Sequence, residues 1–402
     1  MLQNYCDLPE RERRAMIGLT HVAGVGPGLA VRLLQHFGNA ESIFAALTSE
    51  LQGIQGLGPT LVERLQKGMD EAFVSRVLRD MEEHQIQIWL YGSPLYPSSL
   101  YQLSSPPLLL YVRGAWRREW RSEVAVAFVG TRRPDSHGVQ LTRQTVTPLV
   151  QEDWWIVSGG ALGIDTAAHR AALSASGVTI AVLASGVDRP YPPHNRELFR
   201  AIVERGGLLL SEFPPGTRPE KGYFPRRNRL ISALSRGVVV VQCGAKSGAL
   251  HTATCARRIQ VPVLTFPGRP SDPLAAGPHS LIRAGAHLIT SSSDIIHVLT
   301  NEEPGPEQLS LWEGETKHSS RVVTRTKESS ASHADSDLPE LWDNILKTLP
   351  TQSHCTKALD DIAHLAEASV EEVLSALVLM ELDGIVWTGG DMSYGRVESL
   401  QS

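Results

Sequence analysis

The sequence predicts an α/β protein whose core is a doubly wound, Rossmann-like parallel sheet. Residues 124–129 form a continuous apolar run, Val-Ala-Val-Ala-Phe-Val, of the kind that a parallel strand buried on both faces requires. Further short apolar runs recur downstream, at residues 154–157, 179–183, 208–210, 238–241 and 261–264. Segments of helical character separate these runs, and this alternation indicates crossover connections between parallel strands.

The helices expected between the strands complete the core. They cover residues 138–151, a segment that starts at Asp165, residues 196–204 and residues 249–258. We therefore assign residues 121–300 to one Rossmann-like core. Ligands of such sheets bind at the carboxyl ends of the strands, so the loops that follow the strands are the candidate site.

Residues 1–75 are predicted to form a separate helical domain with an internal repeat. The stretch from Val22 to Pro27 recurs from Ile54 to Pro59, and an amphipathic segment follows each copy. This apolar-x-Gly-apolar-Gly pattern resembles a tandem of helix-hairpin-helix (SAM-like) units, whose hairpin amides meet DNA phosphates. The domain is nearly neutral and has few cations near the hairpins. A purely structural role, as tight turns in a helical bundle, is therefore slightly favoured over DNA contact.

Three further segments complete the chain. Residues 76–120 contain four prolines and are predicted to be an extended β connector to the core. Residues 301–337 are rich in Glu, Ser, Thr and Gly and are predicted to be a flexible linker. Residues 338–402 are predicted to form a compact winged-helix domain with three helices and a β-hairpin.

The chain has 402 residues and a net charge of −5, but its charges are unevenly distributed. Residues 121–300 hold 20 Lys and Arg against 12 Asp and Glu, a surplus of 8, and 18 of these cations are Arg. Residues 338–402 hold 3 Lys and Arg against 11 Asp and Glu, a deficit of 8. This asymmetry indicates an anion-binding core and an acidic appendage with a different role.

Three roles are open for the acidic domain: reading duplex DNA, contacting a protein, or competing within the chain for the Arg-rich loops. Its presumed recognition segment begins with Glu371 and Glu372, which would repel phosphate and argue against the first role. The apolar face formed by Val373, Leu377 and Met380 favours protein contact. The same face would also suit the small core of the domain itself.

Four loops of the central core carry residues suited to phosphate binding. They are Gly130–Arg133, Ser158–Gly163, Phe224–Arg229 and Lys246–Thr252. Glycine lets backbone amides approach an anion, a helix N-terminus favours negative charge, and arginine offers forked donors. Repetition of this device along one edge of a sheet suits a polyanion better than a single nucleotide.

The order of these motifs resembles the DNA-processing protein A (DprA/Smf) family along nearly the whole chain. The matching stretches are Phe128 to Arg132, Ser158 to His169, Tyr191 to Asn195, Phe224 to Ser235, Ser247 to Ala253 and Pro267-Gly268. One Gly-rich loop carries little information, but this ordered series is highly specific. Two positions depart from the family pattern, since Gln242 replaces an acidic residue and the pair His279-Ser280 replaces an Asn.

The resemblance implies a cytoplasmic bacterial protein that binds single-stranded DNA, protects incoming DNA and helps load the RecA recombinase during natural transformation. It implies no cofactor. It also implies a tail-to-tail homodimer whose contact includes His279, Ile282 and Leu288.

The residues expected to contact DNA lie in the four loops and in one further motif. They are Gly130, Thr131, Arg132, Ser158, Gly159, Gly160, Asn195, Arg227, Asn228, Arg229, Lys246, Ser247 and Gly248. The three arginines are expected to pair with phosphates, and the glycine amides to cradle them. The two asparagines either bond phosphate or orient a loop.

The main alternative is a nucleotide phosphoribohydrolase-like enzyme on a related fold. Those enzymes resemble this core but carry a Pro-Gly-Gly-x-Gly-Thr-x-x-Glu loop whose Glu performs acid–base work. Residues 244–252 form the comparable loop and contain no carboxylate. No motif pairs a nucleophile with a base, so no catalytic residue is expected, and Asp165 and His169 are assigned structural roles.

Cysteine usage and hydropathy indicate the cellular context. The four cysteines are dispersed and form no CxxC pair, which argues against a disulfide framework and against a metal site. The longest apolar runs are too short to span a bilayer. We therefore expect a cytoplasmic protein without a membrane partner.

Overall fold

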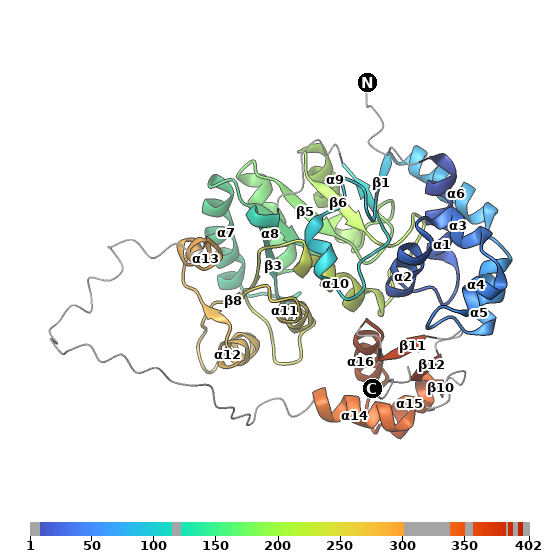
Figure 1. Cartoon of the computed structure of the whole chain (residues 1–402). Helices are drawn as coiled ribbons and strands as arrows, with labels where there is room; N and C mark the ends of the chain where they lie inside the picture. Colours follow the sequence, from blue (N-terminus) through green and yellow to red (C-terminus); the bar gives the residue numbers. More distant parts are fainter. Residues whose placement is uncertain are drawn as a thin grey trace, which may run out of the picture.

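The computed structural model describes residues 9–114, 122–300, 338–349, 357–382, 385–388 and 393–396 (Figure 1). Among these residues, the centre is a nine-stranded sheet of order β1-β2-β6-β5-β4-β3-β7-β8-β9. Its strands are β1 (Ile86–Leu90), β2 (Leu109–Arg113), β3 (Ala125–Val129), β4 (Trp155–Ser158), β5 (Thr179–Val182), β6 (Leu208–Ser211), β7 (Gly237–Val240), β8 (Val263–Thr265) and β9 (His287–Leu288). Strands β3 to β9 pair in parallel, so the predicted parallel core is confirmed.

Helices cover both faces of this sheet, as a doubly wound fold requires (Figure 1). They are α7 (Ser136–Gln151), α8 (Ile164–Ser174), α9 (Arg196–Glu204), α10 (Tyr223–Ala233), α11 (Ala249–Arg258), α12 (Ala276–Arg283) and α13 (Ser292–Thr300). Short 3-10 turns are η1 (Ser98–Gln102), η2 (Ser122–Val124), η3 (Pro193–Asn195) and η4 (Pro273–Ala275). In β3, Val126 and Phe128 belong to the core beneath α7 and α8, whereas Ala127 and Val129 belong to the core beneath α10 and α11. This is the alternation that a strand with period two produces.

The described part of the N-terminal domain, from residue 9 onward, contains six helices. They are α1 (Glu10–His21), α2 (Pro27–Phe37), α3 (Ala40–Ala45), α4 (Thr48–Gln52), α5 (Pro59–Gln66) and α6 (Glu71–Glu83). The two predicted hairpins precede α2 and α5, each of which begins with proline. Gly24 and Gly56 take φ values of +93° and +89°, which favour glycine. The two units are linked, because Arg64 Nη1 donates to the carbonyl oxygen of Ala23 at 2.7 Å.

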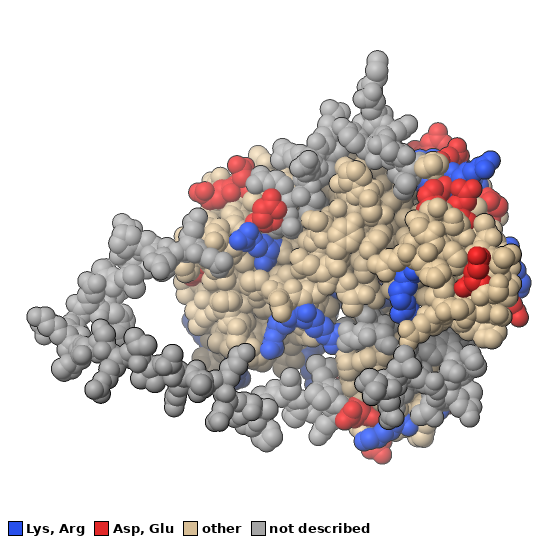
Figure 2. Space-filling view, viewed as in Figure 1, with Lys and Arg blue, Asp and Glu red and all other residues tan. Residues whose placement is uncertain are grey.

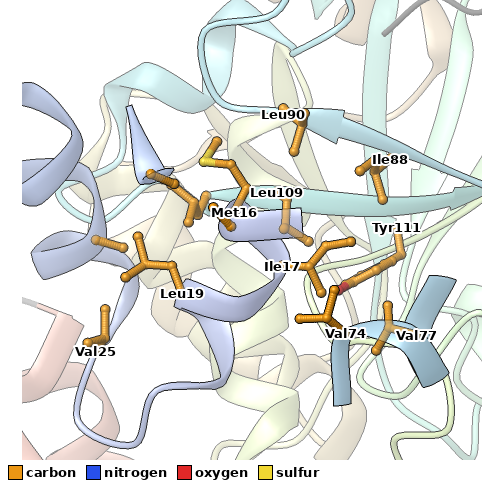
Figure 3. Packing of buried hydrophobic residues seen from close by; sticks show 14 of the residues in the cluster. Met16, Ile17, Leu19, Val25, Val74, Val77, Ile88, Leu90, Leu109 and Tyr111 are labelled. Carbon is orange, nitrogen blue, oxygen red and sulfur yellow. The ribbon is translucent and has the colours of Figure 1, made fainter. Parts of the chain in front are cut away.

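The helical domain shares one hydrophobic core with the edge of the sheet (Figure 3). Met16 and Ile17 of α1 and Val74 of α6 lie in the same cluster as Leu109 and Tyr111 of β2. The predicted boundary at residue 75 therefore falls inside α6. The predicted connector contains the end of that helix and both antiparallel strands, β2 pairing with β1 and with β6. The local sequence pattern could not reveal this pairing, because it depends on contacts with strand β6 about 100 positions away.

The C-terminal unit contains a small antiparallel sheet of order β10-β12-β11. Its elements are α14 (Leu338–Thr348), β10 (Lys357–Ala358), α15 (Leu359–Leu365), α16 (Val370–Leu382), β11 (Val386–Thr388) and β12 (Ser393–Arg396). The winged-helix assignment stays a prediction. Val373, Leu377 and Met380 are buried in the unit's own core, so this face is not open to a protein partner. The predicted linker, residues 301–337, lies outside the described residues.

The C-terminal unit lies beside the sheet helices α10 and α11 (Figure 1). Helix α16 contacts α10, and the guanidinium of Arg258 lies 5.3 Å from the centre of the Trp342 ring. On the face drawn in Figure 2, basic side chains gather over α11, whose last turn carries Arg257 and Arg258. The acidic unit thus neighbours a basic part of the core.

Candidate nucleic-acid interface

The candidate loops follow parallel strands and therefore meet at one edge of the sheet. Gly130–Arg133 follows β3, Gly159–Gly163 follows β4, and Lys246–Gly248 follows β7, while α10 follows β6. The chain runs from β3 outward to β6 and returns to β7 on the other side of β3. Strands β3 and β7 therefore flank the switch point of the sheet, where ligands of open α/β folds bind.

A small pocket of about 60 Å³ at this edge combines a cation with two aromatic rings. Its lining includes Arg132 after β3, Tyr191 after β5 and Phe224 in α10. The Arg132 guanidinium lies 5.3 Å from the centre of the Phe224 ring, which the Tyr191 ring meets edge-on at 6.2 Å. Arg132 is exposed, and Tyr191 is 43% exposed. The pocket offers positive charge and an aromatic surface to the same ligand.

A buried carboxylate holds the glycine-rich loop after β4. Asp165, in the first turn of α8, accepts hydrogen bonds through Oδ2 from the amides of Gly159 at 3.1 Å and Ala161 at 3.3 Å. Burial raises the pKa of Asp165, and the nearby Arg227 opposes this shift. The Gly159 amide, which we expected to cradle phosphate, therefore already donates to a partner inside the protein. The structural role predicted for Asp165 agrees with this geometry.

Asn195 orients the same loop from the connection after β5. Its Nδ2 donates to the carbonyl oxygen of Gly160 at 2.9 Å and to Thr166 Oγ1 at 2.8 Å, and the side chain is buried. Gly160 has a φ of +67°, and a Cβ there would lie 2.6 Å from Phe199 Cε1. Of the two roles left open for Asn195, the geometry supports orientation of the loop.

Arg227 lies beneath the loops instead of on the surface. Its Nη1 donates to the carbonyl oxygens of Gly159 at 2.6 Å and of Val182, at the ends of β4 and β5. Burial lowers the pKa of Arg227 to about 10. Ser158 is also buried, and its Oγ donates to the carbonyl oxygen of Phe128 at 2.6 Å. Arg227 and Ser158 were predicted to bind phosphate. They donate instead to backbone oxygens at the ends of neighbouring strands, and both side chains are buried.

Arg229 points inward as well. Its Nη2 donates to the carboxylate of Glu212, and its Nη1 donates to the carbonyl oxygen of Ser105 at 2.7 Å. The side chains of Arg229 and Glu212 are only 5% and 4% exposed. Arg226 is the more exposed arginine of α10, with its Nε 3.5 Å from Glu212 Oε1. A buried ion pair thus replaces the phosphate contact predicted for Arg229.

The loop after β7 presents Lys246 to solvent. Asn228 Nδ2 donates to the carbonyl oxygen of Gly248 at 3.4 Å, which supports loop orientation for this asparagine too. Ser247 Oγ accepts a hydrogen bond of 3.3 Å from the first amide of α11. A Cβ on Gly248 would meet no atom within 4 Å, so the outer side of this loop is open.

Gln242, which follows β7, is hydrogen-bonded to the segment after β3 at the switch point of the sheet. The Thr131 amide donates to the Gln242 carbonyl oxygen at 2.7 Å, and a Cβ on Gly130 would lie 2.8 Å from the same oxygen. Gln242 Nε2 donates to Asp135 Oδ1 at 3.0 Å, and Asp135 also accepts from the Gly138 amide at 2.7 Å. These bonds, that of Gly138 first, lower the pKa of Asp135. An acidic residue at position 242 would repel this carboxylate, which gives the departure from the family pattern a local reason.

The side chains of the predicted DNA ligands therefore fall into three groups. Those of Arg132 and Lys246 are exposed, those of Thr131 and Ser247 are half-buried, and the buried ones are Ser158, Asn195, Arg227, Asn228 and Arg229. Tyr191 and Phe224 line the pocket but are not among the predicted DNA ligands, although both lie in the motifs given above. Each is an aromatic residue directly before prolines or arginines, and this sequence feature could have identified them as pocket residues.

The residues predicted for dimer contact lie near the outer strand β9. Leu288 in β9 is 52% exposed, and Ile282 in α12 is partly exposed. His279 Nε2 lies 3.0 Å from the carbonyl oxygen of Gly268. These side chains sit at the edge of the described sheet, where β9 pairs with β8.

Two general features of the described residues bear on function. None of their helices is long and apolar enough to cross a membrane. No three His, Cys, Asp or Glu side chains among them are grouped as ligands for a metal ion.

Comparison with known proteins places these features in a family. A family model described as DNA recombination-mediator protein A matches residues 87–300, and one described as a SAM-like helix-hairpin-helix tandem matches residues 16–70. Protein Smf of Synechocystis sp. is 34% identical over 399 residues, which are 96% of this chain and 99% of that protein. DNA processing protein DprA of Bacillus subtilis is 40% identical over 224 residues, 56% of this chain and 75% of that protein.

A solved structure gives the same assignment. The X-ray structure of DNA processing protein A from Streptococcus pneumoniae has a TM-score of 0.59 and 31% identity, covering 72% of this chain and 97% of that one. The helical-tandem prediction is confirmed for residues 16–70. The extent of these matches and the order of the motifs show that the chain belongs to the DNA recombination-mediator protein A family, that of the DprA and Smf proteins.

Proposed function

We propose that this protein binds single-stranded DNA at the carboxyl edge of its sheet, with the pocket of Arg132, Tyr191 and Phe224 at the centre. The observation that carries the proposal is the Arg132 guanidinium above the Phe224 ring, with Tyr191 beside it. A guanidinium pairs with phosphate and an aromatic face stacks on an unpaired base, so one pocket suits both parts of a nucleotide. The names of its relatives, which are DNA processing proteins, support a DNA ligand.

The aromatic lining of the pocket favours single strands over duplex DNA. The rings of Tyr191 and Phe224 can stack on an unpaired base, whereas the bases of a duplex are already paired and stacked. Exposed cations at the same edge, Arg132, Arg133, Arg218 and Lys246, supply contacts that do not depend on base sequence. Binding should weaken as salt rises, with a logarithmic slope of about 0.7 for each phosphate contact to a single strand.

The proposed activity is binding without catalysis. The β7–α11 loop, residues 244–252, contains no carboxylate in the place where a nucleotide hydrolase needs one. Asp165 is bonded to loop amides, and His169 Nδ1 lies 2.7 Å from Thr179 Oγ1 in the interior. Burial lowers the pKa of His169 to about 3, so this ring is neutral at physiological pH. Both groups support the fold and do not face the pocket.

The proposal extends to what happens to the bound strand. Membership in a family of recombination mediators supports protection of incoming DNA and its transfer to the RecA recombinase in the cytoplasm during transformation.

The exposed Leu288 on the outer strand β9, with Ile282 nearby, supports a homodimer in which two such sites are joined. In sedimentation, Leu288→Arg and Ile282→Arg variants should be folded monomers; an unchanged dimer would remove this interface.

Competition binding tests the proposal. Labelled oligo(dT) is displaced with single-stranded DNA, duplex DNA or a nucleoside monophosphate at several salt concentrations. Arg132→Ala should weaken binding about tenfold for all base sequences and reduce the salt slope by about 0.7. Arg79→Ala, which removes an exposed arginine from α6, is the matched control. Equal affinity for duplex DNA, or hydrolysis of the monophosphate, would contradict the proposal and favour the enzymatic alternative.

A further inference from the structure

A second hollow lies next to the candidate interface, between α7 and α8. These helices lie side by side (Figure 1), and the groove that they enclose has a volume of about 500 Å³. Arg143 of α7 and Arg170 of α8 line it from opposite sides, and both are exposed. Ser174 adds a hydroxyl group, whereas the Thr166 hydroxyl donates to the Ala161 carbonyl oxygen, and none of the lining residues is acidic. The groove therefore presents two permanent positive charges to whatever occupies it.

The walls of the groove follow from the way in which α8 packs. Ala167 and Ala171 belong to its lining and are too small to fill the space between the helices. Val139 of α7, 43% exposed, adds an apolar patch that neither helix covers. An anionic ligand with apolar parts, such as a nucleotide chain, matches this combination of cations, a hydroxyl group and apolar surface.

The groove and the pocket of Arg132 share the loop after β4. Ala161 and Leu162 line the pocket, and the next residue, Gly163, lines the groove, so the two hollows are neighbours along this loop. Gly163 has a φ of +86°, and a Cβ there would lie 2.3 Å from the Thr131 carbonyl oxygen, so this position requires glycine. Leu162, the pocket residue next to Gly163, is 39% exposed.

We infer that the α7–α8 groove is a second subsite for the same DNA strand, in which Arg143 and Arg170 pair with phosphates beyond the nucleotide held at Arg132. This inference rests on the proposed function. A strand that leaves the pocket across Leu162 enters the groove without crossing an acidic lining residue. An acidic peptide is also negatively charged, but it has no base that would bind in the aromatic pocket and position it beside the groove. The DNA-binding site therefore extends from the pocket of Arg132 along the α7–α8 groove.

The dependence of affinity on oligonucleotide length tests the path. The wild-type chain and an Arg143→Gln/Arg170→Gln variant are titrated with a short oligo(dT) of about 2 nucleotides and a longer one of about 16. The short oligomer should bind both proteins within about twofold, because it is too short to reach both arginines of the groove from the pocket. The longer one should bind the wild-type chain more tightly and lose about tenfold in the variant. The Arg11→Gln/Arg79→Gln variant makes the same change of charge on the exposed helical domain and should match the wild type.

The outcomes separate this inference from the function on which it rests. Failure of the longer oligomer to bind the wild-type chain would overturn the proposed function. Normal binding of both oligomers by the groove variant, or an equal loss for both lengths, would overturn the subsite alone. The third arm is a titration with oligoglutamate. If the peptide binds through the two arginines while the longer DNA gains nothing, the groove belongs to an acidic protein segment and the inference is wrong.

Discussion

The Arg227 guanidinium donates a hydrogen bond of 2.6 Å to the carbonyl oxygen of Gly159, directly beneath the glycine-rich loop. A Cβ added at Gly159 would lie 2.1 Å from Arg227 Nη1. Gly159→Ala should therefore displace this guanidinium and lower the free energy of unfolding by about 1–3 kcal/mol, as measured by urea denaturation. Gly248→Ala is the control, since its Cβ would meet nothing within 4 Å. Equal stability of the two variants would show that the bond between Arg227 and Gly159 does not stabilise the glycine-rich loop.

The ion pair of Arg229 with Glu212 should contribute to stability and only indirectly to binding. Arg229→Ala leaves a buried carboxylate without its main partner and should cost about 3–5 kcal/mol in the free energy of unfolding. The double variant Arg229→Met/Glu212→Leu should recover most of that loss, because no buried charge remains. A fully stable Arg229→Ala protein with weakened DNA binding would show that Arg229 contacts phosphate after all.

Two buried tyrosines provide a matched pair of substitutions. Among the described residues the Tyr111 hydroxyl has no hydrogen-bond partner, and burial raises its pKa, whereas the Tyr96 hydroxyl donates to the Pro107 carbonyl oxygen at 2.7 Å. Tyr111→Phe should leave the unfolding temperature unchanged or raise it, because an unsatisfied polar group is removed. Tyr96→Phe should cost about 1 kcal/mol. The reverse order of stabilities in thermal denaturation would contradict these environments.

Stability should fall in acid partly through His169. Burial is the main cause that lowers its pKa from 6.5 to about 3, and the positive charge of Arg227 adds to it. Below about pH 6.5, His169 is protonated in the unfolded chain but stays neutral in the folded chain. The free energy of unfolding therefore falls by about 1.4 kcal/mol for each pH unit between 6.5 and 3. His169→Gln should lose less stability than the wild type between pH 7 and 4, whereas the exposed His194→Gln should follow the wild type. Parallel pH profiles for all three proteins would rule out this contribution.

Removal of the C-terminal unit should tighten DNA binding at low salt. Helix α16 contacts α10. Hydrogen bonds from Ser369 lower the pKa of Glu372, and the charge of Lys246 adds to this effect, so the acidic unit approaches the β7 loop. A chain ending at residue 300 should bind oligo(dT) about threefold more tightly, and the difference should vanish at high salt. Glu372→Gln in the full chain should give a smaller effect in the same direction. Weaker binding by a folded truncated chain would show that the unit itself holds DNA.

The parallel core, the helical tandem and the sheet edge that carries the candidate loops could be predicted from the sequence. Apolar runs such as Val124–Val129 and glycine-rich loops such as Ser158–Gly163 are local patterns, and each depends on the preferences of adjacent residues. Parallel strands then bring their carboxyl ends to one edge whatever else the chain does. The helical tandem near the N-terminus was visible for the same reason, because its turns need glycine at fixed positions.

Which of the candidate side chains face the solvent depends on tertiary contacts that local sequence patterns do not contain. Arg229 meets the Ser105 carbonyl oxygen, 124 positions earlier, and Arg227 meets the Gly159 carbonyl oxygen, 68 positions earlier. Arginine has the same donors whether it pairs with a phosphate or with buried backbone oxygens, so its identity does not distinguish the two roles. The choice depends on which distant segments pack around it. This is why Arg132 remained an exposed candidate ligand while Arg227 and Arg229 became part of the interior.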